Sequence, residues 1–329
     1  MMHMPIDRFP GRLPRCAALL MLAWAAPLHP AAAQNANLML PAAEIESRLR
    51  SGSFTIIDWR GSRVPDDRTQ RAALQFEDST VLLAKWANAP RGGGRFNNQP
   101  RYEAAAFEIQ KLFLDESDYV VPPTVIRAFS LDFVAAQVPD QRSTFGQAPR
   151  SVVVALQYWM NQVHHENFWQ PDRVEVDTLY ARRIANFNIL TYLIGHTDSN
   201  IGNYLISTNP LDPHVYSVDN GVSFESEPSN RGEAWKDMRV DRVPRTTVQR
   251  LGQVTREDLE RLLGVLVEFE IRDGELVAVE PGENSSTNRG VRVNDERVQF
   301  GLTSREIRAV ERRINQLVRD ANARRYTLF

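Results

Sequence analysis

The chain has 329 residues, of which 43% are hydrophobic and 24% are charged, and its formal net charge at pH 7 is −2. This composition is typical of a globular protein with one large domain or two lobes. Because the sequence contains no basic stripe, nucleic acid is not expected as a partner.

The N-terminal segment has the pattern of a secretory signal peptide. Three arginines within the first 15 residues precede a short apolar run, residues 16–28, and "AAA" follows directly before Gln34. A positive flank, an apolar core and small residues at the end predict cleavage after Ala33. Since the run is too short for a membrane span, residues 1–33 are predicted to be removed. The mature chain is then secreted or periplasmic and has no membrane span.

Cleavage would also remove Cys16, the only cysteine of the chain. The mature protein is therefore expected to have no disulfide and to depend on its core for stability. The removed segment carries three arginines and one aspartate, so the net charge of the mature chain becomes −4.

The first half of the mature chain is predicted to be mostly sheet. Residues 34–52 form an N-terminal extension, with a short helix that ends at Gly52. Strand-like runs follow; they cover residues 54–59, 71–76, 80–86, 120–130 and 151–160. Between them, residues 99–113 are predicted to be a helix, because apolar side chains recur on one face at Tyr102, Ala106, Ile109 and Phe113.

The second half is predicted to be richer in helix. Residues 177–194 have apolar side chains at helical spacing, and Gly195 follows as a cap. Short strands are expected at 203–207 and 215–219, and a hairpin around Asp273-Gly274. Two further helices carry capping boxes, which begin at Thr255 with Asp258 and at Thr303 with Glu306.

These elements predict an α+β fold with two lobes. Residues 53–160 would form a small β-rich N-lobe with a hinge near 157–162. Residues 161–329 would form a larger helical C-lobe.

The polar loop between the 177–194 helix and the following strand is the first candidate site. Its sequence, "LIGHTDSNIGNYLIS", has apolar runs on both sides, so its ends are pinned in the core. Pairing of the two short strands would bring Asn203 close to Asp219. An amide oxygen and a carboxylate are hard ligands that suit Mg²⁺ or Mn²⁺. Asp198 would then lie near that metal as a base that orients a hydroxyl group, while His196 braces the loop through hydrogen bonds.

Lys85 is the second candidate, because the chain has only three lysines against many arginines. A lysine at the end of the buried run "VLLAK" indicates a place where a compact point charge is needed, for example on nucleotide phosphates. Glu103 on the next helix is expected to hold the ammonium. Glu108 competes for this ion pair, although it is expected to face solvent, and periodicity does not decide between the two.

Four features occur along the chain in the order of the protein-kinase signature set. They are Lys85, Glu103, the His-x-Asp-x-x-x-x-Asn loop and Asp219-x-Gly. The stretches "RYEAAAFEIQKLF", "LTYLIGHTDSN" and "VDNGVSF" resemble the secretory-pathway kinase family that includes the Golgi casein kinase. They are also similar to the wider phosphatidylinositol-kinase-like and bacterial toxin-kinase folds. The resemblance covers about residues 54–226.

The resemblance implies a role for each matched residue. Lys85 would contact the α- and β-phosphates of ATP and pair with Glu103, and Asp198 would be the catalytic base. Asn203 and Asp219 would bind Mg²⁺ or Mn²⁺.

Two further residues are added to the predicted site, and the sequence differs from the kinase motifs at several positions. Gly61 and Leu205 are assigned to the nucleotide site, although no G-x-G-x-x-G is present and Gly61 is the single glycine of its loop. Asn220 replaces the usual Phe after the metal-binding aspartate, and no Ala-Pro-Glu follows. Taken singly, a loop Asp and Asn also fit a turn cap.

The function expected from these residues is an exported atypical kinase. It would transfer the γ-phosphoryl group of a nucleoside triphosphate to a hydroxyl of a protein or small molecule. A catalytically silent pseudokinase that binds nucleotide and a metal-dependent phosphohydrolase stay as alternatives.

Overall fold

The computed structural model describes residues 37–61, 69–95, 98–138, 141–198, 200–224 and 232–329, which all belong to one compact unit, Ala33–Phe329. The predicted signal peptide and its cleavage site after Ala33 lie outside the described residues. In the described part of the chain, no helix is both long enough and apolar enough to cross a bilayer.

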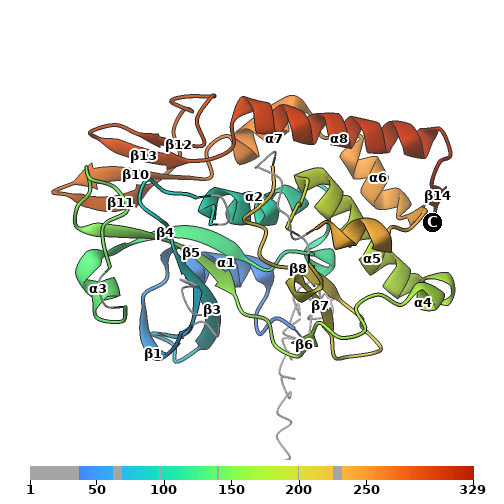
Figure 1. Ribbon diagram of the computed structural model, residues 1–329, viewed down its shortest axis with the longest axis horizontal. Coiled ribbons are helices and arrows are strands. Elements are labelled where there is room, and N and C mark those ends of the chain that lie inside the picture. The colour runs from blue at the N-terminus through green and yellow to red at the C-terminus, as the bar shows by residue number, and fades with distance from the viewer. Residues whose placement is uncertain (1–36, 62–68, 96–97, 139–140, 199, 225–231) are drawn as a thin grey trace, which may run out of the picture. The chain divides into compact units, whose positions relative to one another are not determined.

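The N-lobe is built on a five-stranded antiparallel sheet in the order β1-β2-β3-β5-β4 (Figure 1). Its strands are β1 (Phe54–Arg60), β2 (Thr69–Phe76), β3 (Val81–Asn88), β4 (Thr124–Ser130) and β5 (Ser151–Tyr158). All five were predicted from the sequence. β4 begins only at Thr124, because Pro122 and Pro123 have no N–H to donate to a ladder. β3 continues to Asn88, so Lys85 lies inside this strand and not at its end, as the sequence had suggested.

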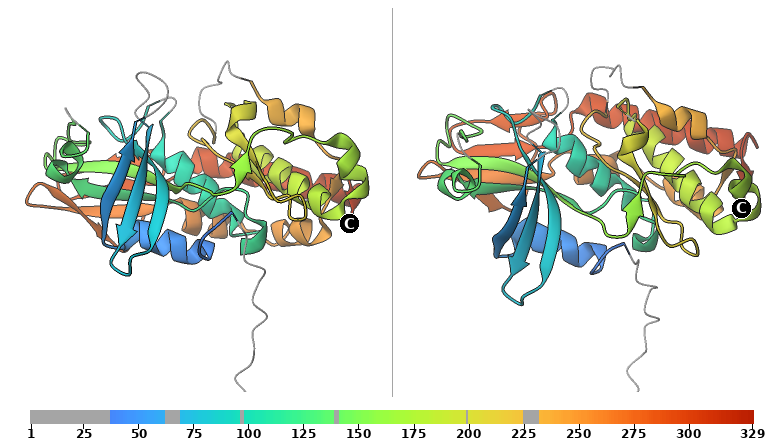
Figure 2. Two further views of the ribbon diagram at one scale, coloured as in Figure 1. Left: turned by 90° about the horizontal axis from the view of Figure 1, so that it is seen from below. Right: turned by 60° about the horizontal axis from the view of Figure 1, so that its bottom comes forward.

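Helix α1 (Ala42–Ser51) packs against the sheet through β4 and β5 (Figure 2). Ile45 and Leu49, one turn apart on its inner face, are fully buried with Trp86 of β3. Burying an aliphatic side chain stabilises a fold by roughly 1.5–3 kcal/mol. This predicted helix therefore belongs to the N-lobe core. The short helix α3 (Leu131–Ala135) follows β4 and contacts the same sheet.

Helix α2 (Pro100–Gln110) packs on β4 and also on α7 (Arg256–Leu263) of the C-lobe. Tyr102, Ala106, Ile109 and Phe113, the face predicted from the sequence, are all buried. α2 therefore contacts both lobes.

The C-lobe helices gather around the long helix α5. They are α4 (Pro171–Val176), α5 (Thr178–Ile194), α6 (Arg245–Leu251), α7 (Arg256–Leu263) and α8 (Ser304–Asn322), with the 3₁₀ turns η1 (Glu116–Asp118), η2 (Ile201–Asn203) and η3 (Ala234–Met238). Both predicted capping boxes are present at the starts of α7 and α8. Small strands complete this region; they are β6 (Val163–His164), β7 (Tyr204–Ser207), β8 (Val215–Ser217), β9 (Arg242–Val243) and β14 (Thr327–Leu328).

A second, four-stranded sheet lies in the order β11-β10-β13-β12. Its strands are β10 (Val267–Arg272), β11 (Glu275–Val279), β12 (Val291–Val293) and β13 (Arg297–Phe300). The predicted hairpin turn is present, with positive φ at both Asp273 (51°) and Gly274 (78°), as a type I′ turn requires. Phe269 and Phe300 belong to the same hydrophobic cluster as Val153 of the N-lobe sheet. A sheet inside the predicted C-lobe range therefore covers part of the N-lobe.

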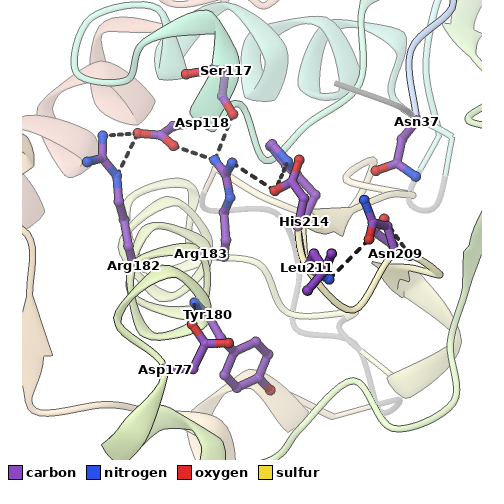
Figure 3. A network of polar contacts seen from close by, with 12 residues as sticks. Asn37, Ser117, Asp118, Asp177, Tyr180, Arg182, Arg183, Asn209, Leu211 and His214 are labelled. Atoms are coloured by element: carbon purple, nitrogen blue, oxygen red, sulfur yellow. Dashed lines mark hydrogen bonds and ion pairs between the residues drawn. The ribbon is translucent and has the colours of Figure 1, made fainter. Parts of the chain in front are cut away.

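Two arginines of α5 fix this helix to the surrounding loops (Figure 3). Arg182 Nε donates to Asp118 Oδ2 at 2.8 Å, and Arg183 also pairs with Asp118. Arg183 donates in addition to Ser117 O at 2.7 Å and to Asp212 Oδ1 at 3.2 Å. This network therefore ties the N-terminal part of α5, the helix that leads into the polar loop, to residues 117–118 and 212.

Candidate active site

Lys85 of β3 contacts two carboxylates from different parts of the chain. Its Nζ lies 3.1 Å from Glu103 Oε1 on α2 and 2.9 Å from Asp219 Oδ1, directly after β8. The side chains of Lys85 and Glu103 are 16% and 10% exposed, whereas Asp219 is 49% exposed. Three elements far apart in sequence therefore bring one cation and two anions to a single point.

The pKa values of this cluster follow from burial and charge. Burial alone would lower the pKa of Lys85, but the Asp219 and Glu103 carboxylates outweigh it and raise the pKa above its usual range. Burial raises the pKa of Glu103, and Lys85 opposes this shift only in part. Lys85 is therefore a permanent cation at the centre of the site.

Glu103, and not Glu108, makes the ion pair with Lys85. Glu108 lies 2.9 Å from Lys111 and 3.4 Å from Arg50, which join α2 to α1. The expectation that Glu108 faces solvent is wrong, because its side chain is only 13% exposed. Its buried position beside Lys111 explains why periodicity could not separate the two glutamates.

Asp219 lies in a tight turn that contacts with Glu103 and His196 stabilise. Its φ of 60° lies in the left-handed region, which Asp tolerates better than most residues. The next N–H, from Asn220, donates to Glu103 Oε2 at 3.0 Å. His196 Nε2 lies 3.3 Å from the carbonyl oxygen of Asp219, which can only accept, so this nitrogen carries the proton. Burial lowers the pKa of His196 to about 4, and the ring is therefore neutral.

The polar loop begins where α5 ends at Gly195, which has a φ of 60°. This left-handed conformation favours glycine, and a Cβ atom there would also displace the Arg313 guanidinium, which would lie 2.6 Å away. Further along the loop, Asn203 Nδ2 donates to Asp198 O at 2.8 Å, and Val218 N donates to Asn203 O at 2.9 Å. The loop thus joins Asp198, Asn203 and the chain before Asp219, as the predicted strand pairing required.

The oxygen donors at this point fit a divalent cation. The hydrogen bond to Asp198 uses the amide nitrogen of Asn203, which leaves its oxygen as the group able to bind metal. The Asp219 carboxylate is half exposed and therefore accessible. One amide oxygen and one carboxylate match the ligand chemistry that Mg²⁺ and Mn²⁺ prefer.

Gly61 lies directly after β1, and Leu205 lies in β7. Gly61 follows β1 at the connection to β2, and a Cβ atom there would meet no neighbour within 4 Å. The rest of that connection, residues 62–68, lies outside the described residues. Leu205 of β7 is partly buried and packs against the N-lobe core cluster. The roles of both in nucleotide binding stay predictions.

Sequence analysis missed two residues that support the site. Trp235 of η3 donates through Nε1 to His196 O at 3.1 Å, which fixes the backbone of the loop. Phe224 is fully buried, and its ring centroid lies 5.5 Å from that of Tyr102 on α2. No spacing signal connects either aromatic residue with the loop, so only the tertiary structure reveals them.

Sheet, α2, polar loop and acidic turn together define a protein-kinase-like fold of the atypical type. The chain is similar to the structure of hydra Fam20 with sugar, with 15% identity, a TM-score of 0.52, and coverage of 88% of this chain and 92% of that one. It is also similar to the crystal structure of the Golgi casein kinase, with 13% identity, a TM-score of 0.50, and coverage of 86% and 74%. No protein-family model and no curated protein sequence matches the chain. The predicted two-lobed α+β fold is confirmed.

Proposed function

We propose that the protein is an exported atypical kinase that transfers the γ-phosphoryl group of a nucleoside triphosphate to a hydroxyl of a protein or small molecule. The observation that carries this proposal is the contact of Lys85 with both Glu103 and Asp219 in a fold similar to Fam20. A metal-binding carboxylate beside a buried lysine is the arrangement that phosphoryl transfer needs for charge neutralisation.

In this mechanism, Lys85 moves from Asp219 to the nucleotide phosphates and keeps its pair with Glu103. Asn203 and Asp219 would hold Mg²⁺ or Mn²⁺, which supplies positive charge to the phosphate oxygens when bound. Gly61 and Leu205 would contact the nucleotide from the β1–β2 connection and from β7.

Asp198 would orient the acceptor and take its proton. The acceptor oxygen forms a bond to the γ-phosphorus while the bond to the β–γ bridging oxygen breaks, and the nucleoside diphosphate leaves with that electron pair. The acceptor proton passes to the Asp198 carboxylate. Asp198 is only 3% exposed, and the amide of Asn203 fixes its backbone. These contacts support a fixed position for the base.

Transfer of label from ATP tests this function. The purified mature chain is incubated with [γ-³²P]ATP and either Mn²⁺ or Mg²⁺, together with peptides, sugars or lipids that carry hydroxyl groups. Metal-dependent labelling of the chain or of one acceptor class, absent in Asp198→Asn, is the expected result. Phosphate release without a labelled acceptor would indicate a phosphohydrolase. A nucleotide-induced rise in melting temperature without any label would indicate a pseudokinase.

A further inference from the structure

A pocket lies in the C-lobe, and Lys85, Glu103 and Asp219 are not among the residues that line it. Its volume is about 270 Å³, close to the lower limit for small-molecule sites. Residues of α5, α8, η3 and the C-terminal strand region line it; those used below are Asn188, Tyr192, Trp235, Arg239, Asp320 and Tyr326. α5 and α8 pack side by side here (Figure 1).

Asn188, which is one of the residues that line this pocket, carries a buried amide donor without a partner among the described residues. Asn188 of α5 is 9% exposed, and its Oδ1 accepts a hydrogen bond from Val240 N at 3.0 Å. Because a backbone N–H can only donate, this bond fixes which end of the amide is oxygen. The other end, Nδ2, has no hydrogen-bond partner within the described part of the chain. Leaving such a donor unsatisfied is unfavourable, so a ligand acceptor would satisfy it.

The pocket also carries an unbalanced positive charge. The Arg239 guanidinium lies 4.9 Å from the centroid of the Trp235 ring. Among the described residues, Arg239 takes part in no ion pair. The one acidic residue of the lining, Asp320, already accepts from Arg325 at 3.0 Å and from Gln316 at 2.8 Å. The lining of one pocket therefore contains both a cation without an ion pair and an amide donor without a partner among the described residues.

The walls are aromatic. Tyr192 and Trp235 have ring centroids 6.5 Å apart, and Tyr326 lines the same pocket. Such surfaces offer stacking contacts to a flat apolar body, which a bare inorganic ion could not use. The aliphatic side chains of Ile189 and Leu317 complete the apolar part of the lining.

We propose that this pocket is a second ligand site, which binds a small aromatic carboxylate. The carboxylate would accept hydrogen bonds from Asn188 Nδ2 and from the Arg239 guanidinium. The aromatic body would lie against Trp235, Tyr192 and Tyr326. Lys85, Glu103 and Asp219 do not line this pocket, although Trp235 also holds His196 of the polar loop, and the proposed binding does not depend on phosphoryl transfer.

Titration of 2-naphthoate and indole-3-acetate into the full mature chain, followed by calorimetry, tests the proposal. 2-Naphthalenemethanol serves as the neutral analogue of the first probe. Saturable binding of at least one carboxylate is expected, and the neutral analogue should bind about tenfold more weakly or worse, because it loses charge-assisted hydrogen bonds.

Substitutions of two pocket residues test whether the carboxylate binds in this pocket. Asn188→Asp keeps the acceptor for Val240 N but removes the donor, and Arg239→Gln removes an exposed charge with little effect on folding. Each should weaken carboxylate binding about tenfold. Arg312→Gln, at an exposed position of α8, should leave binding unchanged. If circular dichroism shows that Asn188→Asp is unfolded, Arg239→Gln alone decides. No saturable binding to the wild type, or unchanged affinity in Arg239→Gln, would overturn the proposal.

Discussion

Arg101 and Glu306 form a two-pronged ion pair that ties helix α2 to helix α8. Arg101 Nη1 lies 2.8 Å from Glu306 Oε2, and Nη2 lies 2.9 Å from Oε1. The same carboxylate caps α8, since Thr303 N donates to it at 2.7 Å. Because Glu103 follows Arg101 by two residues on α2, the last helix of the C-lobe positions the carboxylate that holds Lys85.

Glu306→Gln is therefore expected to destabilise the protein. The side chains of Arg101 and Glu306 are 11% and 8% exposed, so the substitution leaves a buried cation without its anion. The free energy of unfolding, measured by urea denaturation, should fall by about 3 kcal/mol. Glu311→Gln is the matched control on the same helix. Its partner is Arg256 and its side chain is 33% exposed, so about 1 kcal/mol or less is expected. Equal losses in both variants would contradict a special role for Glu306.

Substitutions of Lys85 test its predicted contact with the nucleotide. Lys85→Arg should lose nucleotide affinity nearly as strongly as Lys85→Ala, because a planar fork cannot replace a point charge between two carboxylates. Calorimetric titration with a non-hydrolysable ATP analogue measures this. Equal affinity in the wild type and both variants would remove Lys85 from the nucleotide site.

The two glutamates of α2 provide a matched pair. Glu103→Gln should lower turnover by about 10²-fold, the range for removing one electrostatic contact from an active site. Glu108→Gln should lower it much less, since Glu108 contacts Lys111 and Arg50 and not Lys85. A larger loss in Glu108→Gln would show that the observed ion pair is not the functional one.

The sequence alone was sufficient to predict the helices, caps and turns that depend on a local pattern of residues. The helix 99–113, the caps at Thr255 and Thr303, and the turn at Asp273-Gly274 depend on neighbours within a few residues. The fold class also followed, because the order of motifs along the chain matched the order of the lobes. The structure then brought Lys85, Glu103 and Asp219 together.

What the sequence could not predict depends on distant contacts. Glu103 and Glu108 are equally plausible by spacing, and only the position of β3 beside α2 separates them. The pairing of β10 with β13 joins residues 267–270 to 297–300, and the face on which this sheet packs depends on the N-lobe. Trp235 and Glu306 likewise contact residues that are distant in the sequence, namely His196 and Arg101. A single sequence carries no local signal for such pairs.

The stability of the protein should depend on pH through Glu268, which lies on β10 of the second sheet. Burial alone would raise the pKa of Glu268, but hydrogen bonds from Gln299 and Gly282 and the charge of Arg297 outweigh it and lower the pKa below its usual value. A lowered pKa in the folded state stabilises the protein above the unfolded-state pKa of about 4.5, and this stabilisation is lost as the pH falls through the folded-state value.

The test compares urea denaturation of the wild type and Glu268→Gln from pH 7 to pH 3. The difference in the free energy of unfolding should be largest at pH 6–7 and should shrink below about pH 4.5. A difference that is constant over the whole range would show that Glu268 is not ionised in the folded protein.

Export of the protein stays a prediction of the N-terminal sequence. Protein purified from its native cells should begin at Gln34, because the small residues before it fit a signal-peptidase site. Edman sequencing of the extracellular or periplasmic fraction measures this directly. An intact Met1 on material from the cytoplasm would contradict both the cleavage and the localisation.

The division of work between Asp198 and Asp219 tests the kinase proposal most directly. Calorimetric titration of Mn²⁺ with a non-hydrolysable ATP analogue is compared with turnover in Asp198→Asn and Asp219→Asn. Asparagine is chosen at position 219 because it also tolerates the left-handed backbone seen there. Asp219→Asn should lose metal-dependent nucleotide binding together with turnover. Asp198→Asn should keep most of the binding and lose turnover by about 10²–10⁴-fold, the range for a positioned general base. Full activity in Asp198→Asn, or equal loss of binding in both variants, would contradict the proposed mechanism.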